Sequence, residues 1–251
     1  MSGHSKWSTI KHKKGALDAK RGKLFTKLSK EIIIASKEGP DPEMNYRLRL
    51  AIQNAKDANM PSDNIERSIK KGSGDDSGSS NYEEINYEGY GPGGTAFIVQ
   101  TLTDNKNRTA AEVRSCFAKN GGNLGESGAV AWNFETKGVI DALVDTDNVD
   151  DVSMAGIDAG AIDVEVEGKN ISFYTSYQGF EAVRKSLETI NDVIIERSEI
   201  ELVPTSFADV DQKVAIKTLK LLEKLEDLDD IQKVFSNLNI TEELVTEFQQ
   251  A

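Results

Sequence analysis

The sequence opens on a segment rich in positively charged side chains, the residue types that bind phosphate. Lysine and arginine neutralise phosphates and release the counterions of a nucleic acid, and an indole can stack on an exposed base. Trp7 offers that second contact, or it anchors the segment to a hydrophobic core. We expect the segment to bind nucleic acid, with a solvated charge run that binds nothing specific as the alternative. Nine cations fall within residues 6–30: Lys6, Lys11, Lys13, Lys14, Lys20, Arg21, Lys23, Lys27 and Lys30.

Charge is divided unevenly along the chain. The formal net charge is −12 at pH 7, yet residues 1–72 hold 16 Lys and Arg against 8 Asp and Glu, whereas residues 73–251 hold 14 against 34. A nucleic acid responds to local potential rather than to total charge. The basic part can therefore bind phosphate while the acidic remainder repels it and limits the contact area.

Side chains with catalytic or metal-binding potential are few and poorly spaced for such chemistry. Cys116, the only cysteine, has no histidine within 100 residues, so we interpret it as a packing residue. His4 and His12 have no Cys, Asp or Glu within five residues, which argues against a zinc site and a Ser-His-Asp triad. The glycine-rich residues 89–94 lead into a strand-like segment without lysine, which is typical of a hairpin turn and not of a phosphate-binding loop. We expect no enzymatic activity, no metal and no cofactor.

Length and composition set the scale of the fold. A chain of 251 residues fits two or three domains better than one. Its 38% hydrophobic and 29% charged residues are typical of a folded globular protein. A single cysteine cannot form an internal disulfide, and no apolar run approaches the roughly 20 residues of a membrane span. These features favour a cytoplasmic protein without a membrane partner or an evident small-molecule substrate.

Helical periodicity runs through residues 17–72. In the first helix the apolar residues share one stripe and the lysines from Lys20 to Lys30 cluster on a neighbouring stripe, so one face suits a core and the other an anion. Gly39-Pro40 ends that helix, and further helices are predicted at about 43–58 and from Pro61 to Gly72. Short amphipathic helices bury their stripes against one another, which predicts a helical bundle behind a basic arm.

Beyond a Gly/Ser-rich linker at residues 73–81 the periodicity becomes strand-like. The predicted elements are strands at 82–88, 95–103 and 129–134, with a helix at 107–119. Residues 137–204 then follow the order strand, helix, strand, strand, helix, strand of a ferredoxin-like unit. A helix at 209–225, a short strand near Val234 and a last helix from Thr241 need a sheet to pack on.

These elements predict an α+β protein of three domains. Residues 1–72 form the basic arm and helical domain, and residues 73–81 the linker. The simplest arrangement returns the C-terminal elements to the sheet begun at Tyr82, which makes a discontinuous α/β domain of residues 82–136 and 205–251. The ferredoxin-like domain, residues 137–204, is then an insertion.

Several motifs are long enough to indicate a family. They are GHSKW at 3–7, DAKRGK at 18–23, NMP at 59–61, DNIER at 63–67, YEGYGPGG at 87–94, TDN at 103–105, NRT at 107–109 and GGNLG at 121–125. Together they resemble the YebC/PmpR family of probable transcriptional regulatory proteins, to which the mitochondrial translational activator of cytochrome oxidase is related. Tyr46 after Asn45, where the family has proline, and Ala129 after Gly128, where it has serine, depart from the pattern.

The resemblance implies a three-domain architecture without enzymatic activity. The family is described as DNA-binding transcriptional regulators, and other members resemble ribosome-associated factors that relieve stalling at proline-rich sequences. We therefore expect a nucleic-acid-binding regulator of gene expression acting on DNA, with a translation factor on ribosomal RNA as one alternative and an acidic protein-interaction scaffold as another. The flexible cationic arm by itself favours RNA slightly, since it reads shape and phosphate rather than base edges. The candidate contacts are His4, Ser5, Lys6, Trp7, Lys11, His12, Lys13, Lys14, Lys20, Arg21, Lys23, Lys27 and Lys30, with Asn59, Asn64 and Arg67 as a second patch.

Overall fold

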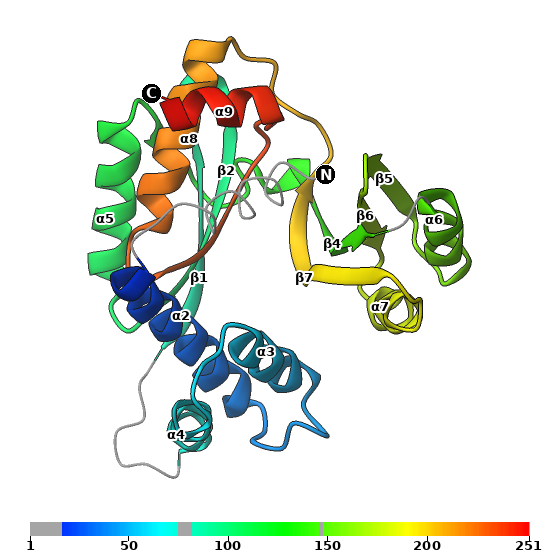
Figure 1. The fold of residues 1–251 in the computed structure, drawn as a ribbon. Helices are drawn as coiled ribbons and strands as arrows, with labels where there is room; N and C mark the ends of the chain where they lie inside the picture. Colours follow the sequence, from blue (N-terminus) through cyan, green and yellow to red (C-terminus); the bar gives the residue numbers. More distant parts are fainter. Residues whose placement is uncertain (1–16, 75–81, 146–147, 251) are drawn as a thin grey trace.

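Three helices and two antiparallel sheets with their own helices make up the described part of the protein (Figure 1). The structure, a computed structural model, describes residues 17–74, 82–145 and 148–250, without the side chains of residues 17–20, 242, 249 and 250. The predicted α+β class is confirmed. Among the described residues, no helix has the length and hydrophobicity to cross a bilayer.

The N-terminal helices are α2 (Leu17–Lys37), α3 (Tyr46–Asp57) and α4 (Ser62–Ser73). Helix α3 begins later than predicted because the Asn45 side chain accepts a hydrogen bond from the Leu48 amide at 3.0 Å and caps it. Helix α4 ends at Gly74, whose φ of 85° is left-handed. The three helices share one core, which includes Leu28, Ile32, Leu48, Ala55 and Ile65.

The first sheet has the strand order β3-β1-β2-β8. Strands β1 (Glu83–Tyr90) and β2 (Ala96–Thr103) form a hairpin, which confirms the interpretation of the glycine-rich turn. Strand β3 is Asn123–Leu124, and β8 (Ile231–Ser236) pairs with β2 although it lies more than 100 residues further along the chain. The C-terminal segment is therefore part of this sheet.

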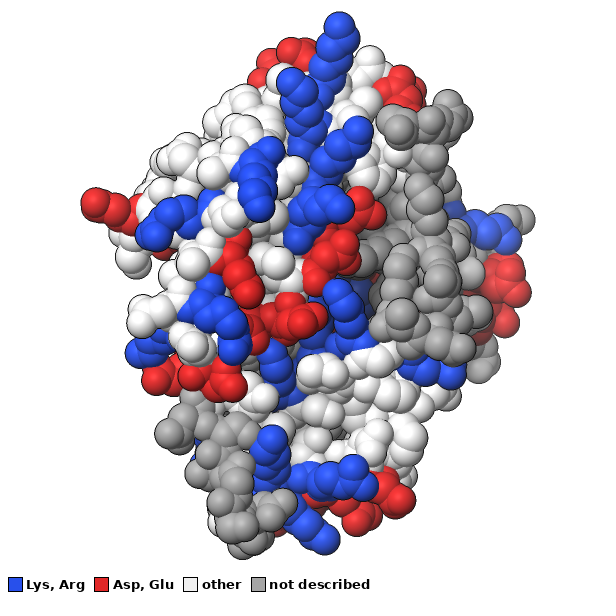
Figure 2. Space-filling view, turned by 90° about the vertical axis from the view of Figure 1, so that its left-hand side faces the viewer, with Lys and Arg blue, Asp and Glu red and all other residues white. Residues whose placement is uncertain are grey.

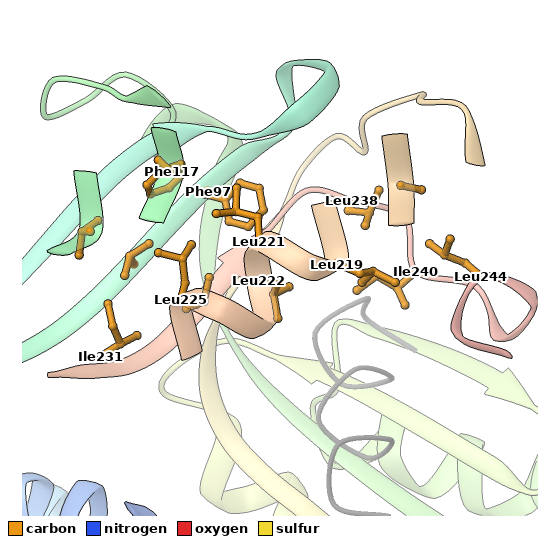
Figure 3. Packing of buried hydrophobic residues seen from close by; sticks show 14 of the residues in the cluster. Phe97, Phe117, Leu219, Leu221, Leu222, Leu225, Ile231, Leu238, Ile240 and Leu244 are labelled. Atoms are coloured by element: carbon orange, nitrogen blue, oxygen red, sulfur yellow. The ribbon is translucent and has the colours of Figure 1, made fainter. Parts of the chain in front are cut away.

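Helices α5 (Lys106–Lys119), α8 (Gln212–Glu226) and α9 (Glu242–Gln250) accompany this sheet. Figure 3 shows Leu221 of α8 pointing toward Phe97 of β2, with Phe117 of α5 beside it. The Phe97 and Phe117 rings meet edge to face at 5.8 Å between centroids. Leu219 of α8 lies on the side of Ile240, close to α9 (Figure 3). One apolar core therefore fixes α5 and α8 side by side.

The second sheet has the order β5-β6-β4-β7, the strand order of a ferredoxin-like unit. Its strands are β4 (Phe134–Val144), β5 (Asp163–Glu167), β6 (Asn170–Thr175) and β7 (Val193–Pro204), and its helices are α6 (Val149–Asp158) and α7 (Phe180–Glu188). Strands β4 and β7 pair from Phe134 opposite Pro204 to Val144 opposite Val193. The proposed boundary between residues 136 and 137 falls inside β4.

The predicted strand at 129–134 is wrong. Residues Ala131–Asn133 form a 3-10 helix, and β4 starts only at Phe134. The reason is the buried carboxylate of Glu88, which accepts hydrogen bonds from the amides of Gly128, Val130 and Ala131 at 2.7, 2.8 and 2.9 Å. Amides that donate to a carboxylate cannot pair with a neighbouring strand.

Candidate nucleic-acid interface

The lysine face of α2 meets an anion, as its pattern predicts, but that anion is part of the same chain. Residues 226–230 (EDLDD) join α8 to β8, and we call them the acidic turn. The Lys23 ammonium donates to the carbonyl of Asp227 at 3.1 Å and lies 3.7 Å from the Asp229 carboxylate. The Lys27 ammonium donates to the carbonyl of Glu226 at 2.8 Å. The acidic turn therefore takes up part of the binding capacity of both lysines.

Lys30 lies in the interior, which corrects the expectation that it contacts phosphate. Its ammonium donates to the Asp230 carboxylate at 2.9 Å and to the carbonyls of Asp229 and Leu102 at 2.9 and 3.4 Å. The side chains of Lys30 and Asp230 are only 8% and 7% exposed. A buried ammonium with these partners anchors α2 to the first sheet.

Asp230 gathers donors from three further residues. Arg108 lies 2.7 Å from the carboxylate, and the hydroxyls of Thr109 and Thr103 donate at 2.8 and 3.2 Å. Burial raises the pKa of Asp230, but the hydrogen bonds from Arg108, Lys30 and Thr109 outweigh it and bring the pKa to about 2. The TDN and NRT motifs around residues 103–109 thus hold the acidic turn in place.

The remaining candidates on the N-terminal segment divide by what the structure describes. Arg21 is exposed near the beginning of α2. Lys20 belongs to α2, and its side chain is outside the description. The other candidates lie outside the described residues: His4, Ser5, Lys6, Trp7, Lys11, His12, Lys13 and Lys14.

The second patch follows α3. Asn59 is exposed in a left-handed conformation, with φ of 58°, and Arg67 is exposed on α4. Asn64 is half-buried, and its backbone carbonyl accepts a hydrogen bond from the Ser68 hydroxyl at 2.8 Å. Helix α4 lies toward the end of α2, away from the acidic turn (Figure 1). The structure therefore does not bring this patch together with Arg21.

The sequence analysis did not identify a third group of cations. Lys213, Lys217, Lys220 and Lys224 are all exposed on α8, and we call them the α8 lysine stripe. Figure 2 shows Lys and Arg side chains gathered on the upper part of the face that α5 and α8 form, above a band of Asp and Glu. The signal was the spacing i, i+4, i+7, i+11, which places four side chains on one face of a helix. The large negative net charge of residues 73–251 gives no indication of this local group of lysines.

A groove of about 480 Å³ separates α2 and α3 from β7 and β8. Its charged walls interact with one another, since Lys233 of β8 pairs with Glu199 of β7. Burial raises the pKa of Glu31, and the nearby Lys233 opposes the rise. Among the described residues, no group of three or more His, Cys, Asp or Glu could hold a metal ion.

Fold and site define an α+β protein whose basic first helix is bound to its own acidic turn. The chain belongs to the TACO1/YebC family: residues 5–75 match the model of the TACO1/YebC protein N-terminal domain, and residues 82–238 match that of the TACO1/YebC second and third domain. The resemblance proposed from the motifs is confirmed.

Relatives and a solved structure resemble the chain over nearly its whole length. A probable transcriptional regulatory protein of Dehalococcoides mccartyi strain BAV1 is 54% identical over 249 residues, 99% of this chain and 98% of the relative. One of Halothermothrix orenii is 50% identical over 254 residues, all of both chains. The crystal structure of a conserved hypothetical protein from Aquifex aeolicus matches with a TM-score of 0.82 and 47% identity, covering 93% of this chain and 96% of that one.

Proposed function

We propose that this protein is a non-enzymatic regulator of transcription that binds DNA through its basic N-terminal segment. The observation that carries the proposal is the name shared by relatives about half identical over the full chain, probable transcriptional regulatory protein. The charge pattern supports it, because residues 1–30 contain nine cations and only one carboxylate, that of Asp18.

The cations of α2 differ in how far they are available to bind phosphate. Lys30 is committed to Asp230, and Lys23 and Lys27 are shared with the acidic turn. The proposed phosphate contacts are therefore the lysines of residues 6–14, Lys20 and Arg21. Asn59, Asn64 and Arg67 remain a proposed second contact.

Charge reversal of Lys11, Lys13 and Lys14 to Glu in the full chain tests this proposal. The affinity for a short DNA duplex should be lost, because each lysine neutralises a phosphate and contributes about 0.9 to the slope of log K against log salt. A matched control reverses Lys137, Lys169 and Lys185, which all lie within residues 134–204 and in none of the proposed contacts. Unchanged affinity in the arm variant would exclude the arm as the binding segment.

The choice between DNA and ribosomal RNA requires a cellular measurement. The names of the relatives point to transcription, so we expect ultraviolet crosslinking and sequencing to recover promoter DNA with the protein. Recovery of ribosomal RNA in its place would support the translation factor. An acidic protein-interaction scaffold would enrich neither DNA nor ribosomal RNA.

A further inference from the structure

The α8 lysine stripe points straight out of the molecule. At 100° per residue its four lysines fall within about 60° of one another, and the buried residues Ala215 and Leu222 lie on the opposite side of the helix. The two carboxylates of α8, Glu223 and Glu226, lie about a quarter turn or more from the centre of the stripe. The stripe is a continuous row of positive charge.

Helix α5 extends this row through Lys119. Cys116 of α5 lies within the field of both Lys119 and Lys224: burial raises the pKa of its thiol, and the two ammonium groups oppose the rise. Lys119 is exposed, as are the stripe lysines. Two helices that are distant in sequence thus contribute cations to one surface.

Within the described part of the chain, the side chains of Lys119 and the stripe lysines make no hydrogen bond or ion pair, whereas those of Lys23 and Lys30 on α2 are both paired. Adjacent unpaired ammonium groups repel one another, and an external anion relieves that repulsion.

The borders of the surface restrict how an anion can approach. Helix α9 packs on α8 and carries Glu243 and Glu247, and the acidic turn closes the end of α8. On the side toward α5, Lys119 continues the positively charged surface. A polyanion therefore fits along α8 and over the end of α5, where a compact anion would leave most of the row unneutralised.

We propose that the α8 lysine stripe and Lys119 form a further contact for the phosphate backbone of a nucleic acid, separate from the N-terminal arm and from the proposed patch around Asn59. From Lys213 to Lys224 the helix rises about 16 Å, at 1.5 Å per residue. One strand of a duplex places a phosphate every 3.4 Å along its axis, so the row reaches several phosphates. Lysines on a helix face bind by charge and position the nucleic acid without reading its sequence.

The experiment compares two full-length triple variants of equal charge. Lys217, Lys220 and Lys224 are replaced by Gln, which keeps helix propensity nearly unchanged, and the control replaces Lys137, Lys169 and Lys185 by Gln. We expect the stripe variant to bind a short DNA duplex about tenfold more weakly at 50 mM salt and to lose about 2 to 3 units of salt slope. The control should keep both values within a factor of two.

Two results would overturn the proposal: unchanged duplex affinity in the stripe variant, and an equal loss in the control. Unchanged duplex affinity together with lost binding of polyglutamate would assign the surface to an acidic protein. The arm variant separates this inference from the proposed function. If only the arm variant fails to bind, the proposed function stands and the contact at the stripe is wrong. If only the stripe variant fails, the contact at the stripe stands and binding through the arm is wrong.

The unmodified protein provides an independent measurement through its single cysteine. Cys116 is half-buried beside Lys119 and Lys224, so a duplex on this surface should shield it. We expect the rate of alkylation by iodoacetamide to fall severalfold when the duplex is bound at low salt, and to recover when high salt releases it. An alkylation rate that does not respond to bound duplex would contradict the proposed contact.

Discussion

The Lys30 ammonium and the Asp230 carboxylate lie 2.9 Å apart although 200 positions separate them in the chain. Both side chains are buried where α2 meets the first sheet, and Arg108 of α5 shares the same carboxylate. One ion pair thus joins three elements: the first helix, the helix after β2 and the segment before β8. The basic and acidic parts of the chain are therefore joined by an ion pair buried inside the protein.

Removing either partner should destabilise the protein, but unequally. Asp230→Ala leaves the Lys30 ammonium buried without a carboxylate and should cost about 3–5 kcal/mol of unfolding free energy. Lys30→Met should cost less, about 1.5–3 kcal/mol, because Asp230 keeps Arg108 and two threonine hydroxyls. Urea denaturation measures both values. Lys23→Ala is the control: its ion pair with Asp229 is 57% and 81% exposed, so the loss should stay below about 1 kcal/mol.

The same carboxylate predicts a dependence of stability on acid. The pKa of Asp230 falls from 3.8 to about 2 in the folded protein, so its stabilisation is complete above pH 4 and is lost as the pH falls from about 4 through 2. Asp230→Asn removes that contribution, and its unfolding free energy should therefore decline less steeply over this range. Thermal unfolding at a series of pH values tests the difference. Parallel declines in the variant and the parent would show that Asp230 does not contribute to acid unfolding.

The sequence predicted the elements with a strong period and missed those fixed by distant contacts. The helix periodicity of α2 and the run of strand-favouring residues in β2 are local, so both were found. Strand β3 has only two residues, Asn123 and Leu124, and no period to detect. The predicted strand at 129–134 failed because the chain there is shaped by Glu88, about 40 residues earlier. A sequence window contains no sign of such a partner.

The candidate site shows the same division. The lysine face of α2 was recognised by spacing, yet nothing local indicated that Glu226–Asp230, about 200 residues away, would meet it. The α8 lysine stripe, in contrast, can be predicted from the spacing of its residues alone. The net charge of residues 73–251 gives no sign of it, because the sum is dominated by carboxylates elsewhere in that segment.

The packing of α4 on α2 depends on Gly72. A Cβ atom at this position would lie 1.9 Å from the Ser36 hydroxyl oxygen and 2.3 Å from the Ile33 carbonyl oxygen. Gly72→Ala should therefore separate the two helices and destabilise the protein by about 1–3 kcal/mol. Gly22→Ala is the matched control, because a Cβ there meets no atom of the described residues within 4 Å and alanine favours a helix by roughly 0.5–1 kcal/mol. Thermal unfolding should move in opposite directions for the two variants, and a neutral Gly72→Ala would contradict the close contact.

The acidic turn should compete with phosphate for the lysines of α2. Asp227→Asn with Asp229→Asn removes two carboxylates of the acidic turn, and the ion pair of Lys23 with Asp229 is lost. Since Asp230 is retained, the buried anchor of α2 stays in place. Less repulsion and a freer ammonium should raise the affinity for a DNA duplex about three- to tenfold at low salt, and the gain should fade as salt screens exposed charges.

The control for this competition is Asp150→Asn with Asp151→Asn, which makes the same change in net charge on the exposed first turn of α6. That variant should bind the duplex with nearly the parent's affinity, because α6 lies on the far side of the second sheet from α2 (Figure 1). Fluorescence anisotropy at several salt concentrations measures both variants. Equal gains would mean that only net charge matters, and no gain at the acidic turn would show that its carboxylates do not restrain the basic helix.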